Sequence, residues 1–133
     1  MIKKTKKPAV EKTAVIKAPA EWLYCAMEET DAQRIASILT ENGFDDTEVW
    51  PEAGVVEIPL AEKASMDMEW VECDLEDDYS NAFLTENQVK CLYMVTIVPD
   101  AFPRAREVML LITEKLGGFF CGDTEDFTPS IGK

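Results

Sequence analysis

The chain has 133 residues, 47% of them hydrophobic, which is enough for one folded domain with a sizeable core. It contains no run of the roughly 18 to 20 apolar residues that a membrane-spanning helix needs, no apolar signal segment after its basic start, and no histidine. We therefore expect a cytoplasmic protein without membrane contact, and catalysis of the Ser-His-Asp or Cys-His type is excluded.

The net charge of −13 is distributed unevenly along the chain. Residues 1–19 contain six lysines and one glutamate, a net charge of +5, which leaves −18 for residues 20–133. We expect a basic, flexible tail over 1–19 and a single α+β domain over 20–133. An acidic body repels nucleic acid and attracts basic proteins, so no direct nucleic-acid contact through the folded body is expected.

The first part of the body predicts a strand, a helix and more strand. Apolar and aromatic residues over 21–29 indicate a strand. Thr30 is expected to cap a helix that ends at Asn42-Gly43. Residues 47–60 follow as a strand or a bent pair of strands, because a proline and a glycine interrupt them.

Residues 68–75 predict the next strand, and this strand carries the densest run of acids. In an extended chain Glu72, Asp74 and Glu76 would point to one face, about 6.5 to 7 Å apart. The acids around them extend this predicted row: Asp67, Glu69, Asp77 and Asp78. Residues 77–88 read as a polar turn that contains a short helix.

The last part of the body predicts a central strand, a helix and a closing strand. Both faces of the strand over 89–98 are largely apolar, so each face needs a cover. Asp100 is expected to cap a helix that runs to Leu116 and stops at two glycines. Residues 119–127 close the domain as a strand and a turn.

The element order β-α-β-β-β-α-β resembles a ferredoxin-like α+β sandwich, with an antiparallel or mixed sheet and two helices on one face. The two halves are also similar in sequence, since "LYCAM" and "DTEVWP" have counterparts in "LYMVT" and "DTEDFTP". The second face of the strand over 89–98 then needs a cover from residues 60–86, from the N-terminal segment, or from a second copy in a homodimer.

The four cysteines do not have the spacing of a metal site. Cys25, Cys73, Cys91 and Cys121 each lie in an apolar or strand-like run, and no C-x-x-C pair or histidine accompanies them. Reduced core thiols are therefore favoured over a four-thiolate zinc site or disulfides, and we expect no cofactor.

Two acidic motifs resemble metal sites without completing them. Asp74, Glu76 and Asp78 alternate as in a calcium loop, but Tyr79 stands where such a loop needs glycine and Thr85 where it needs glutamate. Two acidic turns in the similar halves leave a shared divalent cation open, against the favoured interpretation as ordinary surface turns: Asp123, Glu125 and Asp126 in one, and Asp45, Asp46 and Glu48 in the other.

These patterns favour a small non-enzymatic binding protein that contacts a basic protein surface, as an inhibitor, an immunity-type protein or a nucleic-acid mimic. The expected contact residues are the seven acids from 67 to 78 named above together with Trp50, which follows a polar turn and is the tryptophan expected to be exposed.

Two alternatives from other classes remain open. One is a dimeric, small-ligand-binding regulatory module with a pocket lined by Trp22, Tyr24 and Tyr93. The other is a carboxylate-based enzyme that uses a divalent metal, which would need a cleft and converging acids.

Overall fold

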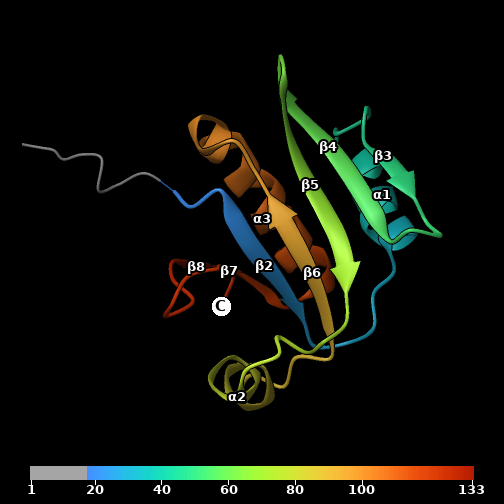
Figure 1. The fold of residues 1–133 in the computed structure, drawn as a ribbon. Coiled ribbons are helices and arrows are strands. Elements are labelled where there is room, and N and C mark those ends of the chain that lie inside the picture. Colours follow the sequence, from blue (N-terminus) through green and yellow to red (C-terminus); the bar gives the residue numbers. More distant parts are fainter. Residues whose placement is uncertain (1–17) are drawn as a thin grey trace, which may run out of the picture.

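The computed structural model describes residues 18–133, so the predicted basic tail lies outside the described residues except for its last two positions. These residues form one seven-stranded antiparallel sheet and three α-helices (Figure 1). The strands are β2 (Glu21–Ala26), β3 (Glu48–Trp50), β4 (Val55–Ala61), β5 (Ala64–Val71), β6 (Cys91–Thr96), β7 (Phe119–Gly122) and β8 (Ser130–Ile131). The helices are α1 (Ala32–Glu41), α2 (Asp78–Glu86) and α3 (Phe102–Leu116), with the short 3-10 helix η2 (Pro99–Ala101) before α3.

The strand order across the sheet is β3-β4-β5-β6-β2-β7-β8. The fold class is therefore α+β as expected, but the sheet is larger than the four strands of a ferredoxin-like sandwich and than the five strands of the predicted order. Residues 48–61 form two strands, β3 and β4, and β8 adds a further strand at the opposite edge. None of the helices in the described part of the chain is long and apolar enough to cross a membrane.

The main core lies between the sheet and helices α1 and α3, which cover one face (Figure 1). Its centre is a pair of tyrosines on neighbouring strands: Tyr24 of β2 is directly opposite Tyr93 of β6. Tyr24 donates a hydrogen bond to the carbonyl of Gly117 (2.8 Å), and Tyr93 donates one to the carbonyl of Thr30 (2.7 Å). Burial raises the pKa of both phenols, so they remain neutral donors.

A smaller core lies on the opposite face, where α2 packs against the end of the sheet. Leu84 of α2 is buried there, and Phe83 stacks on Phe127 with ring centroids 4.0 Å apart. Residues 60–86 thus supply part of the cover that the second face of β6 was expected to need, over Leu92. They do not reach Met94, which is 41% exposed on that face.

Both predicted helix starts were wrong by one position. Asp31, not Thr30, caps α1 by accepting a hydrogen bond from the Arg34 N–H group (2.8 Å), while the Thr30 hydroxyl donates to the carbonyl of Glu28. Asp100 lies within η2, and α3 begins after Ala101 without a side-chain cap. The predicted helix ends at Asn42 and at Gly117 are confirmed.

The predicted strand over 68–75 was also wrong at both ends. Strand β5 begins at Ala64 and ends at Val71, because it pairs with β4 in a hairpin whose turn is at residues 62–63. Residues 72–77 form the irregular connection to α2. The short helix expected within 77–88 is confirmed as α2.

Candidate functional site

The sheet face opposite α1 and α3, here called the open face, is organised in three parallel rows by the pairing of the strands. Directly paired residues point to the same face, so the register fixes each row. The apolar row is Val71, Leu92, Cys25 and Phe119, and it packs in the core under α2. The mixed row is Trp50, Val55, Glu69 and Met94. The carboxylate row is Glu48, Glu57, Asp67, Thr96 and Glu21.

The carboxylate row places acids side by side on successive strands. Glu57 of β4 is directly opposite Glu48 of β3 on one side and Asp67 of β5 on the other. Thr96 of β6 separates Asp67 from Glu21 of β2. Neighbouring strands lie about 4.7 to 4.9 Å apart, and like charges directly opposite one another destabilise a sheet.

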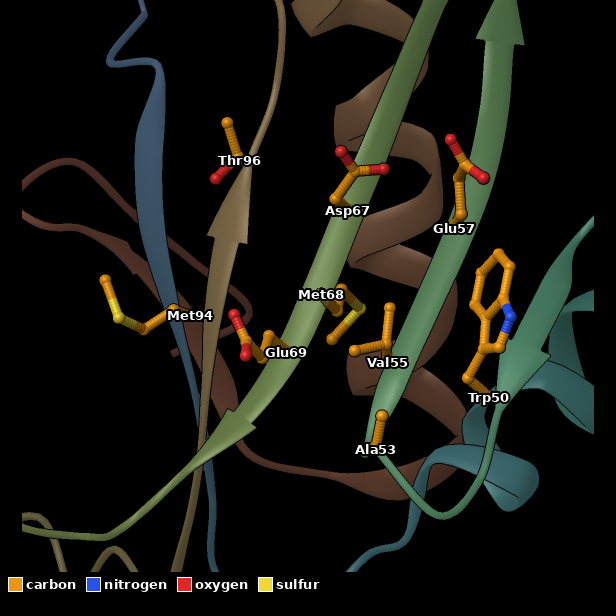
Figure 2. Close-up of a pocket in the computed structure, with 9 residues that line it drawn as sticks. All are labelled: Trp50, Ala53, Val55, Glu57, Asp67, Met68, Glu69, Met94 and Thr96. Carbon is orange, nitrogen blue, oxygen red and sulfur yellow. The ribbon is translucent and has the colours of Figure 1, made fainter.

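The mixed row borders the carboxylate row and forms the floor of a shallow hollow (Figure 2). The hollow has a volume of about 510 Å³ and includes residues of both rows. Its lining residues are Trp50, Ala53, Val55, Glu57, Asp67, Met68, Glu69, Met94 and Thr96. The indole of Trp50 is 47% exposed, so the hollow offers aromatic and thioether surface directly beside carboxylates.

No basic side chain of the described residues lines this hollow. Residues 18–133 contain seven basic residues, namely Arg34, Lys63, Lys90, Arg104, Arg106, Lys115 and Lys133. Within this range the ion pair formed is the one between Arg104 and Glu107 on α3. The carboxylates of the row thus receive no compensating charge from the described part of the chain.

The structure brings three of the predicted contact residues together on the open face. Asp67 and Glu69 alternate with the buried Met66 and Met68 along β5, and Trp50 lies two strands away. The prediction that Trp50 is exposed is confirmed.

The other five predicted acids, Glu72, Asp74, Glu76, Asp77 and Asp78, lie outside the open face. The row expected from Glu72, Asp74 and Glu76 does not exist, because β5 ends before them. Two acids of this group instead hold the chain locally. Asp74 accepts hydrogen bonds from the Glu76 N–H group (2.8 Å) and the Asn81 amide (3.0 Å), and Asp77 caps α2 by accepting one from the Ser80 N–H group.

Sequence reasoning missed the members of the site that come from other strands, above all Glu57, Glu48 and Met94. One signal was available: in "VVEIPL" Val56, Ile58 and Leu60 alternate with Val55, Glu57 and Pro59, which assigns Glu57 to an uncovered face. The missing information was the register, which decides that Glu57 is opposite Asp67.

The alternatives to this site find less support in the structure. Trp22, Tyr24 and Tyr93 are fully buried core residues and do not line a common pocket. Cys25, Cys91 and Cys121 are buried free thiols as expected, whereas Cys73 is exposed.

No group of three or more Cys, Asp or Glu side chains within residues 18–133 is arranged to hold a metal ion. In the turn at 123–126, the carboxylate of Asp126 accepts hydrogen bonds from the hydroxyls of Thr124 and Thr128, which lower its pKa.

Comparison with protein-family models, with curated proteins and with solved structures gives no match to this chain. The functional inference therefore rests on the chemistry of the open face.

Proposed function

We propose that this protein is a non-enzymatic binding protein whose open face binds a basic segment of another protein. The observation that carries the proposal is the position of Glu57, directly opposite an acid on each side, Glu48 and Asp67. Cross-strand pairs of like charge cost the sheet stability, and a cationic partner would remove that cost. Complementary charge would also steer a basic partner to this face.

The mixed row suits the rest of such a segment. Lysine and arginine carry apolar stems below their charged groups, and these stems can pack on Val55 and Met94 while the charges reach the carboxylate row. Trp50 offers a ring face to a guanidinium or ammonium group. The partner expected from this chemistry is a protein surface rich in lysine and arginine, as nucleic-acid-binding proteins have, so the proposed role is that of an inhibitor or nucleic-acid mimic.

A homodimer through the open face is less favourable on the same grounds. A second copy would bring a second carboxylate row against the first, and the repulsion would be strongest at low ionic strength.

The test is an affinity capture from the lysate of the cells that natively produce the protein, with three baits. The baits are the native chain, Glu57→Lys, and Glu72→Lys as the control with the same charge change outside the open face. We expect a basic protein to be retained by the native chain and by Glu72→Lys at low salt, to be lost with Glu57→Lys, and to be released by high salt.

The purified partner is then titrated against all three chains. Equal binding by the three would show that the open face is not the binding surface. An equal loss of affinity with both substitutions would show that the interaction depends on the net charge of the protein and not on the open face.

A further inference from the structure

The described part of the chain begins beside the carboxylate row. Glu21, the first residue of β2, is itself a member of this row. Just before it, the carbonyl of Ala20 accepts a hydrogen bond from the Ile97 N–H group (2.8 Å), and the carbonyl of Pro19 accepts one from the Trp22 indole (2.8 Å). These contacts fix the end of the sheet at which residues 1–17 join the domain.

Residues 1–17 have the charge that the open face lacks. They contain Lys3, Lys4, Lys6, Lys7, Lys12 and Lys17 and one acid, Glu11, a net charge of +5. They also contain aliphatic residues, among them Val15 and Ile16, which can pack against the apolar residues of the mixed row. The segment is thus a basic, partly apolar sequence of the class proposed above as the ligand.

The reach of this segment is sufficient. A chain spans up to about 3.3 Å per residue, so 17 residues extend to roughly 56 Å. The path from β2 across β6 and β5 to β4 is three strand spacings, about 15 Å. A tethered segment also acts at an effective concentration in the millimolar range, which favours weak ionic contacts over those with a separate molecule.

We propose that the Lys-rich segment of residues 1–17 binds the open face of its own chain, with its ammonium groups against Glu57 and Asp67, and competes there with the basic partner. The competition rests on the function proposed above, while occupancy of the face by the segment does not. In the absence of a partner the segment lowers the repulsion within the carboxylate row, and a partner must displace it.

The test is zero-length carbodiimide cross-linking of the full chain, which joins a lysine only to a carboxylate in direct contact with it. Equal amounts of ¹⁴N- and ¹⁵N-labelled protein are mixed before the reaction, and peptides are identified by mass spectrometry. We expect Lys12 or Lys17 to be linked to Glu57 or Asp67 within one isotopic species. The yield should fall several-fold as the Debye length shrinks from about 30 Å at 0.01 M salt to about 3 Å at 1 M.

The control acids are Asp123 and Glu125, which lie in the exposed turn after β7. Links to these acids at the same yield as to Glu57 and Asp67 would overturn the proposal, as would the absence of links to the open face. Links that join ¹⁴N to ¹⁵N peptides would show instead that the segment of one molecule binds the open face of a second copy.

Substitution of Lys12 and Lys17 by glutamine should raise the affinity for the basic partner, and an unchanged affinity would refute the competition. The two proposals fail separately. If Glu57→Lys loses the partner but no cross-links form between residues 1–17 and the open face, the proposed function stands and this inference fails. If such cross-links form but Glu57→Lys still captures the partner, occupancy of the face by the segment stands and the proposed function fails.

Discussion

At the scale of single residues, acids of this chain have two different environments. Asp74 and Asp77 accept hydrogen bonds from backbone N–H groups and so order the connection between β5 and α2. Glu57 accepts no such bond from a described residue and is flanked by like charge. The first kind stabilises the fold, whereas the second leaves its hydrogen-bonding capacity and charge available to a ligand.

Substitution of Asp74 by asparagine tests the first kind. The amide of Asn81, together with the Glu76 N–H group, lowers the pKa of the Asp74 carboxyl, so its ionised form stabilises the folded state. That contribution is present above the unfolded-state pKa of about 3.9 and is lost as the pH falls through the lower folded-state pKa. Asp74→Asn should therefore reduce the free energy of unfolding at neutral pH, and this difference should shrink in acid. Denaturant titrations between pH 2 and pH 7 measure it, with Glu72→Gln as the control expected to show no comparable change.

Two adjacent glycines allow the cost of an unusual backbone conformation to be measured apart from the cost of a steric clash. Gly117 and Gly118 both have positive φ, 81° and 77°, but only at Gly118 would an added Cβ lie 2.4 Å from the carbonyl oxygen of Cys25. Gly117→Ala should cost about 1 to 3 kcal/mol from backbone conformation alone, because its φ of 81° and ψ of −168° lie in a region that essentially only glycine adopts. Gly118→Ala should cost a further 1 to 3 kcal/mol, approximately, because β7 must move away from β2. Equal costs in thermal or denaturant unfolding would contradict this contact.

At the scale of elements, the sequence predicted periodic segments well and their ends less well. Strand β6 follows from a nearly continuous apolar run and the bodies of both long helices follow from apolar periodicity, and both signals depend only on local sequence. The end of β5 does not, because Glu72 to Asp74 continue the alternation of the strand without a partner to pair with. Pairing with a neighbouring strand, rather than the side-chain pattern, decides where this strand stops.

Leu84 is the one buried residue of helix α2, and its replacement tests the cover over the apolar row. Leu84 is 3% exposed and packs in the smaller core, whereas Thr85 beside it is exposed. Leu84→Ala should reduce the free energy of unfolding by about 2 to 5 kcal/mol, and Thr85→Ala should leave it nearly unchanged. A small effect of Leu84→Ala in denaturant unfolding would mean that α2 adds little to the stability of the sheet.

At the scale of the whole molecule, the fold class was predictable and the site only in part. The similar segments "LYC" and "LYM" lie on β2 and β6, and the sheet pairs them about the tyrosines, so that Leu23 is opposite Met94 and Leu92 is opposite Cys25. The sequence indicates such a pair of halves. It does not give the extra edge strand β8, which has two residues, nor the cross-strand register that assembles the carboxylate row.

The carboxylate row should be measurable as a strain on the native sheet. In a chain whose six lysines in residues 1–17 are replaced by glutamine, so that this segment cannot compensate the row, Glu57→Gln with Asp67→Asn removes the direct like-charge pairs. This change should raise the free energy of unfolding at low salt by roughly 0.2 to 1 kcal/mol. The gain should decrease as added salt screens the native row. Glu52→Gln with Glu62→Gln, two exposed acids in turns, is the matched control. If both pairs give the same gain, the effect is one of total charge and not of the row.

The central place of β2 has a consequence for how the protein is made. This strand, at residues 21–26, pairs with β6 on one side and with β7 on the other, so its second partner is synthesised about 100 residues after it. At roughly 5 to 20 residues per second, the interval between them is about 5 to 20 seconds. During this time the aromatic sequence "WLYCAM" lacks β7, and until residues 91–96 are made it lacks both neighbouring strands. An unpaired segment of this kind is prone to aggregation, which flanking charges oppose. The lysines before it and the three acids that follow within five residues, Glu28, Glu29 and Asp31, supply that protection on the nascent chain.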